Sequence, residues 1–136
     1  MVRNVSEGVF ALLGVVVGAV GTYLIETRLT QRSEAIAARL ELPAVRTRVF
    51  DVEAGLLPLE EQVNRVRARV TLLGVDQKLV SDVREAAVAC WKECRAMYEA
   101  DPDEYGISND KMKRLDAAIA ALDDAIVRAS RRISWR

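Results

Sequence analysis

The clearest hydrophobic pattern along the chain is an uncharged run from Gly8 to Ile25, which reads GVFALLGVVVGAVGTYLI. As a helix, a run of this length spans about 27 Å, close to the ~30 Å hydrocarbon core of a bilayer. In lipid a single segment must satisfy its backbone hydrogen bonds internally, so a helix is the expected form. The pattern therefore predicts one transmembrane helix over residues 8–25, preceded by a short tail over residues 1–7.

Two other interpretations of this run stay open. A cleaved signal peptide would use Ala19-Val20-Gly21 as its cleavage site, although its N-terminal region is almost neutral and the apolar run is long for such a peptide. A helix buried in a protein core is the second alternative. It is disfavoured because no polar face interrupts the run.

Basic residues around the run predict its orientation. Arg3 is the only basic side chain ahead of it, whereas residues 26–48 contain Arg28, Arg32, Arg39, Arg46 and Arg48. Flanks rich in lysine and arginine stay in the cytoplasm. We therefore expect a single-pass protein of the inner (plasma) membrane, with residues 1–7 as an extracytoplasmic tail and residues 26–136 in the cytoplasm.

Small residues inside the run suggest that spans associate. Ala11, Gly14, Gly18 and Gly21 fall on roughly one helical face, and Gly14 and Gly18 form a GxxxG pair. A smooth face of this kind lets two membrane helices approach closely. The alternative is that glycine is simply common in membrane spans. The pattern predicts a homo-oligomer assembled through these four positions.

After the span, apolar positions continue at helical spacing. The first helix is expected to run on over residues 26–42, with Leu29, Ile36 and Leu40 as its apolar stripe. Proline disfavours the helical conformation of the residue before it, so Pro43 should end or kink this helix. A short helix is predicted over residues 44–54, because apolar residues follow Pro43 at helical spacing.

Three longer helices are predicted over residues 58–73, 76–101 and 109–133, each with apolar residues at alternating spacings of four and three. Pro58 suits a first helical turn, Gly74 a left-handed helix end, and Asp76 an N-cap. No segment shows sustained alternation typical of a strand. Short connections favour antiparallel neighbours. The fold class is therefore all-α: one transmembrane helix that continues into an antiparallel three- to four-helix bundle with heptad seams.

Composition disfavours several function classes. The chain of 136 residues has 20 Lys and Arg, 20 Asp and Glu, and no histidine. A nucleic-acid binder usually has a strong basic excess, so no nucleic-acid partner is expected. Without histidine the chain lacks the usual general base near neutral pH and the commonest metal ligand. It also contains no phosphate-binding glycine loop and no GxSxG motif. We expect no enzymatic activity, no cofactor and no metal.

Two cysteines and one acidic loop are further candidates for chemistry. Cys90 and Cys94 lie four residues apart in CWKEC, where a helix would aim them poorly for a disulfide, so they are expected to be reduced and buried on a seam. The loop that starts at Asp101 resembles the start of a calcium loop. Its twelfth position is Met112 in place of glutamate and its fifth is Tyr105, so a solvated turn is expected.

The last predicted helix contains three acids that could be read as a catalytic carboxylate pair: Asp116, Asp123 and Asp124. They lie off the apolar seam of that helix. We therefore expect them to face solvent or to form salt links to neighbouring helices.

The C-terminal segment RASRRISWR concentrates arginine beside two apolar residues. We expect contact with an anionic inner leaflet, where each basic residue near the surface contributes about 1 kcal/mol. The residues expected to make this contact are Arg28, Arg32, Arg128, Arg131, Arg132 and Trp135. This requires the last helix to run back toward the bilayer. Alternatively, these arginines only complement the dipole at a helix end.

Two stretches carry a resemblance, RVTLLGVDQKLVSDVREAAVACW (Arg69–Trp91) and DAIVRASRRI (Asp124–Ile133). Together with the leading span they resemble uncharacterised small single-span membrane proteins of bacteria, of the actinobacterial type, with a cytoplasmic helical domain. The resemblance implies a bacterial inner-membrane setting and brings no catalytic residues.

The expected function is that of a non-enzymatic, membrane-anchored helical scaffold or partner-docking protein that self-associates. Its partners would be the lipid bilayer, further copies of the chain and a protein of unknown identity. One alternative is an oligomeric membrane-perturbing effector, phage-related or defensive. Another is an anchor subunit of a larger membrane machine.

Overall fold

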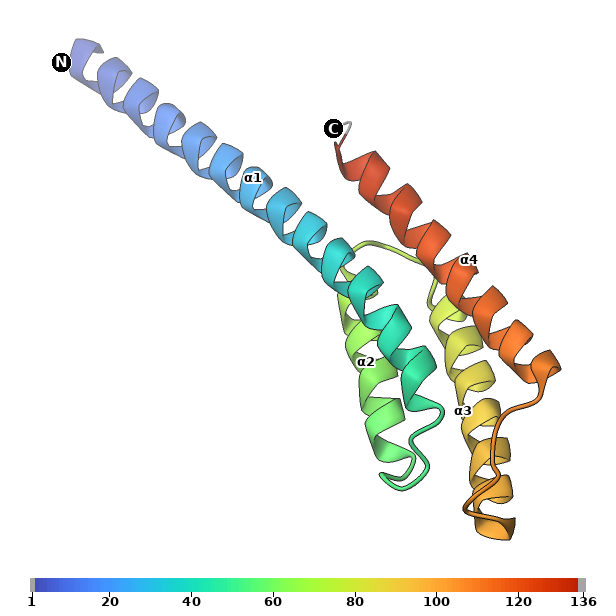
Figure 1. Cartoon of the computed structure of the whole chain (residues 1–136). Coiled ribbons are helices and arrows are strands. Elements are labelled where there is room, and N and C mark those ends of the chain that lie inside the picture. The colour runs from blue at the N-terminus through green and yellow to red at the C-terminus, as the bar shows by residue number, and fades with distance from the viewer. Residues whose placement is uncertain (1, 135–136) are drawn as a thin grey trace.

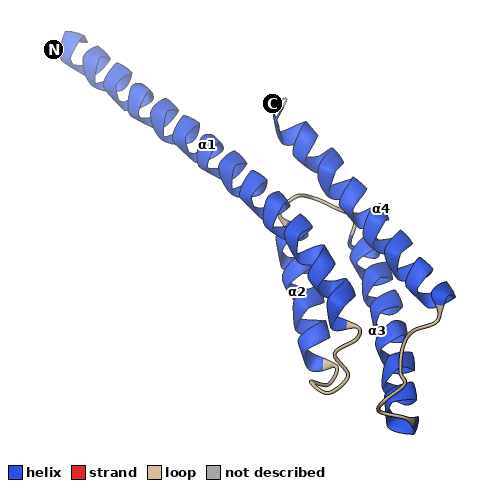
Figure 2. Cartoon of the chain, viewed as in Figure 1, coloured by secondary structure: helices blue, strands red, loops and turns tan. Residues whose placement is uncertain are grey.

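The computed structural model describes the backbone of residues 2–134, and the side chains of residues 19–133 except those of Tyr23 and Ile25. In chain order the helices are α1 (Val2–Arg48), α2 (Leu57–Thr71), α3 (Gln77–Ala100) and α4 (Asn109–Ser134). The described part contains helices and loops without strands (Figure 2). The all-α prediction is confirmed.

The four helices form an up-down-up-down bundle. α1 packs against α2 and α4, and α3 packs against the same two helices, so α1 and α3 lie on a diagonal with little contact. The N-terminal part of α1 projects well beyond the other three helices, and α4 runs back along α1 in the opposite direction (Figure 1). The C-terminal end of α4 therefore lies at the end of the bundle from which α1 projects.

Sequence patterns place α2, α3 and α4 within two residues of their observed ends. Gly74 follows α2 with a φ of 70°, the left-handed conformation that glycine adopts without strain. The Asp76 carboxylate accepts a hydrogen bond from the backbone N–H of Lys78 and caps α3. These local signals agree with the packing, so the predicted boundaries hold.

The core follows the predicted heptad seams on these three helices. Their buried apolar side chains include Leu59, Val63, Val66 and Val70 on α2, Val80, Val83, Ala87, Cys90 and Cys94 on α3, and Leu115, Leu122, Ile126 and Ala129 on α4. The seam predicts burial of Met97 as well, three residues after Cys94, but this side chain is 43% exposed near the end of α3.

Pro43 does not end the first helix, and the prediction of a separate helix over residues 44–54 is wrong. Pro43 lies inside α1, which continues to Arg48, and residues 49–56 form the loop to α2. A proline in a helix interior costs about 3 kcal/mol. Val45 and Val49 beyond it are completely buried, and two such side chains contribute roughly 3–6 kcal/mol. Core packing thus outweighs the proline.

The predicted apolar stripe of this segment is also wrong. Leu29, Ile36 and Leu40 are 60%, 62% and 73% exposed. The buried face of α1 instead consists of Ala35, Ala38, Leu42 and Val45, and Val49 directly after the helix is buried with them. Small alanines let α1 approach α2 and α4 closely. The face with the alanines is therefore buried, and the face with the larger leucine and isoleucine side chains stays exposed.

Ion pairs show the register between α1 and α4. Arg39 pairs with Asp123 and Arg46 with Asp116, each at 2.8 Å. The two arginines are seven residues apart on α1, and the two aspartates are seven residues apart on α4 in the reverse order. This is the register of antiparallel neighbours. The hydrogen bond from each guanidinium to its aspartate raises the pKa of that arginine. The prediction that these two acids form salt links is confirmed.

At the end of the bundle opposite the projecting part of α1, side chains of α3 form hydrogen bonds to the α1–α2 loop. Trp91 Nε1 donates to the Asp51 carbonyl at 3.2 Å and Arg95 donates to the Val52 carbonyl at 2.8 Å. The Tyr98 hydroxyl donates to the Glu53 carboxylate at 3.0 Å. α1 therefore stops at Arg48 because the chain turns to meet α3.

Candidate membrane-facing site

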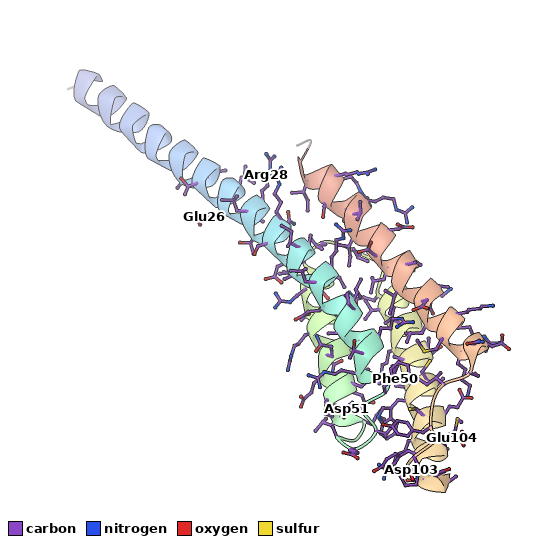
Figure 3. All side chains as sticks on the ribbon, viewed as in Figure 1. Glu26, Arg28, Phe50, Asp51, Asp103 and Glu104 are labelled. Atoms are coloured by element: carbon purple, nitrogen blue, oxygen red, sulfur yellow. The ribbon has the colours of Figure 1, made fainter. Side chains whose placement is uncertain are left out.

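Five arginines gather at the end of the bundle from which α1 projects. Arg28 and Arg32 come from α1, and Arg128, Arg131 and Arg132 come from the last turns of α4. Arg28 is labelled at this end in Figure 3, whereas Asp51 and Asp103 are labelled at the opposite end. We call the five residues the basic end. The antiparallel course of α4 brings together two clusters that are about a hundred positions apart in the sequence.

Most side chains of the basic end lack a carboxylate partner. Arg28, Arg32, Arg128 and Arg132 form no ion pair with another residue that the structure describes. On the body of the bundle, by contrast, Arg69 bridges Glu34 and Glu41 at 2.9 and 3.3 Å. Residues 125–134 contain no acid, so positive charge accumulates at this end.

Two grooves open between α1 and α4 at the basic end. One has a volume of about 310 Å³ and is lined by Arg28, Gln31, Leu73, Ala129, Arg132 and Ile133. The other has a volume of about 370 Å³ and is lined by Arg32, Ile36, Arg39, Val127, Ser130 and Arg131. Each groove combines arginines from both helices with apolar side chains, an arrangement suited to an amphipathic anion.

Sequence reasoning missed the contribution of the α2–α3 turn. The Gln31 side chain donates a hydrogen bond to the Leu72 carbonyl at 3.2 Å, which holds this turn against α1. Leu73 then lines the groove beside Arg28. Only the up-down course of the helices places this turn at the basic end, and no local motif in the sequence marks it.

Of the residues predicted to contact the inner leaflet, five form the basic end and Trp135 lies outside the described residues. Of the predicted self-association face, the side chains of Ala11, Gly14 and Gly18 also lie outside the described part. Gly21 is described, and a Cβ added there would meet no atom within 4 Å. A Cβ at Gly21 therefore meets no obstacle among the described residues.

Residues 8–25 form part of α1, so the prediction of a helix there is confirmed. Among the residues that the structure describes, no helix has a stretch long and apolar enough to cross a membrane. Most of the expected span, residues 8–18 with Tyr23 and Ile25, is outside the described side chains.

The cysteines and the acidic loop take the structural roles expected of them. Cys90 and Cys94 are buried free thiols, and burial raises the pKa of both, with the nearby Glu93 adding to the effect. In the loop, the Asp101 carboxylate accepts the backbone N–H of Asp103, as in a turn. No group of three potential ligands that could hold a metal ion occurs among the described residues.

These features define a four-helix bundle with a projecting first helix and a basic end beside it. Comparison with protein families, with curated proteins and with solved structures finds no match to this chain. The chemistry of the basic end and the pattern of α1 therefore supply the arguments for function.

Proposed function

We propose that the chain is a non-enzymatic, membrane-anchored helical scaffold of a bacterial inner membrane. Residues 8–25 anchor it, residues 1–7 lie outside, and the bundle rests on the cytoplasmic surface, where it docks further copies or another protein. The observation that carries this proposal is the continuity of α1 from Val2 to Arg48. The uncharged run and the buried face from Ala35 to Val45 belong to one helix, so the anchor and the bundle move together.

Distances along α1 support this placement. Arg28 lies three residues beyond Ile25, or about 5 Å at 1.5 Å per residue, and Arg32 lies about 10 Å beyond it. The headgroup region extends roughly 5–8 Å beyond each side of the hydrocarbon core. The attraction of basic residues to an anionic leaflet decays over a Debye length of about 8 Å. Both arginines therefore fall where that attraction acts.

Extraction of membranes with alkaline carbonate tests the anchor. The full chain should remain in the membrane pellet, and Val16→Arg with Val17→Arg should release it, because two arginines at the centre of a span cost roughly 5–7 kcal/mol. Thr30→Arg with Ser33→Arg adds the same charge beyond the run and should leave the chain in the pellet. Release of the wild-type chain, or a mature protein whose mass shows that residues 1–21 were removed, would contradict the anchor.

Self-association through the glycine face is the second part of the proposal. Gly14→Ile with Gly18→Ile should reduce crosslinked oligomer in membranes, because bulky side chains keep the two helices apart. Gly21→Ile is the sharper variant, since a Cβ at this position meets no atom of its own chain. Unchanged crosslinking in all three substituted positions would contradict assembly through this face.

Two outcomes would point to the alternative functions. Loss of membrane potential on induced expression would indicate a membrane-perturbing effector, whereas the scaffold should leave the potential intact. A different protein that co-purifies in fixed stoichiometry would indicate an anchor subunit of a larger machine.

A further inference from the structure

The two grooves at the basic end differ in charge from the grooves that α3 forms with α2 and α4. The groove between α3 and α4 contains Asp82 and Glu85 beside its basic residues, and the one between α2 and α3 contains Glu60 and Glu85. No carboxylate lines the groove at Arg28 and Arg132, or the one at Arg32 and Arg131. In the latter, however, Arg39 is already paired with Asp123. An anion would meet repulsion from carboxylates in the two grooves beside α3, and none from the lining of the groove at Arg28 and Arg132.

The lining of this groove has two chemically distinct parts. Arg28 and Arg132 supply guanidinium groups from α1 and α4, and neither forms an ion pair with a described residue. Leu73, Ala129 and Ile133 supply the apolar part. Arginine binds phosphate oxygens through paired N–H donors, and Gln31 is already engaged by the Leu72 carbonyl, so the two guanidiniums are the anion-binding groups.

We propose that this groove binds the headgroup phosphate of an anionic phospholipid. The phosphate diester would lie between Arg28 and Arg132, and its glycerol and first methylene groups would lie against Leu73, Ala129 and Ile133. The shared chemistry is that of any phosphate, but the apolar part of the lining and its position beside the projecting part of α1 favour a lipid over a free ion. The proposal rests on the proposed membrane anchoring and adds a specific lipid-binding site to it.

Native mass spectrometry of the full chain in an uncharged detergent tests the site. Phosphatidylglycerol should bind at least ten times more tightly than phosphatidylcholine with the same acyl chains. Arg28→Gln with Arg132→Gln should remove this preference. Arg65→Gln with Arg114→Gln lowers the net charge equally at exposed positions away from the basic end, and it should keep the preference. Inorganic phosphate at the concentration of the lipid should not displace it.

Three results would overturn the proposal. These are equal binding of the two lipids by the wild-type chain, a preference that survives in the Arg28→Gln, Arg132→Gln variant, and displacement of the lipid by inorganic phosphate. Equal loss in the control pair would show that net charge alone attracts the lipid, and would also overturn it. Circular dichroism of both variants verifies that each has folded. Lipid binding is measured in detergent and membrane anchoring by carbonate extraction, so the two experiments are independent. A chain that does not prefer the anionic lipid can still be anchored, and a chain that is not anchored can still be tested for lipid preference.

Discussion

Replacing Pro43 by alanine tests whether α1 is continuous between the run and the bundle. Pro43 is exposed inside α1, and its carbonyl accepts a hydrogen bond from the Thr47 hydroxyl, which the substitution keeps. Alanine would restore the missing backbone N–H and remove the ring clash, a gain of about 3 kcal/mol in a helix interior. The unfolded chain gains freedom with alanine, which lowers the benefit by about 0.4–1 kcal/mol.

The net stabilisation of Pro43→Ala is therefore about 2 kcal/mol. For a bundle of this size that corresponds to a rise in Tm of roughly 8 °C. Thermal unfolding of the full chain in detergent, followed by helical circular dichroism, measures it. Pro58→Ala is the matched control, because Pro58 lies in the first turn of α2, where proline is well tolerated. Its Tm should change little. An unchanged or lower Tm for Pro43→Ala would refute the continuous helix.

The remaining predictions concern a backbone conformation and two pH dependences. Gly74→Ala should destabilise the bundle by about 1–2 kcal/mol in urea unfolding, because φ is 70° there and an added Cβ meets no further steric contact. Gly106→Ala is the control: φ is not positive at this glycine and an added Cβ meets no contact, so stability should not change. The hydrogen bond to Glu53 raises the pKa of Tyr98. The neutral phenol is thus favoured in the folded state, its contribution is complete below the pKa of a free tyrosine, and it is lost as pH rises through the raised value. A pH titration of tyrosinate absorbance measures this pKa, and the Tyr98→Phe variant identifies which part of the signal belongs to Tyr98. Glu53→Gln should lower the pH midpoint of that part, and an unchanged midpoint would exclude the hydrogen bond. Burial raises the pKa of Cys90 and Cys94, so their alkylation in mildly alkaline buffer should be far slower in the folded than in the unfolded chain, and equal rates would show the thiols to be exposed.

The sequence predicts α2, α3 and α4 well because local signals and packing agree there. Heptad spacing, the Asp76 cap and the left-handed Gly74 all indicate the same boundaries. In such segments one apolar face is much larger than any other, so the period of the pattern identifies the buried side.

The segment after the run was harder to predict because it has two apolar faces. Leu29, Ile36 and Leu40 form the bulkier one, but the fold buries the face that contains Ala35 and Ala38. This choice depends on α2 and α4, which no local pattern reveals. Pro43 misled for the same reason, since its local cost is offset by burial of residues beyond it.

The residues of the basic end could be named from the sequence, but their grouping depended on topology. Arg28 and Arg132 meet because an even number of helices returns the chain to the end where α1 projects. Leu73 joins them only because the α2–α3 turn lies at that same end, and it was therefore missed.

The orientation of the chain in a bacterial membrane tests the proposed account most directly. Reporter enzymes that are active only outside the cytoplasm would be fused to each terminus of the full chain. The account predicts reporter activity when the enzyme precedes Met1, and none when it follows Arg136. Strong activity of the C-terminal fusion would place the bundle and its basic end outside the cytoplasm, away from the cytoplasmic leaflet, and would contradict the account.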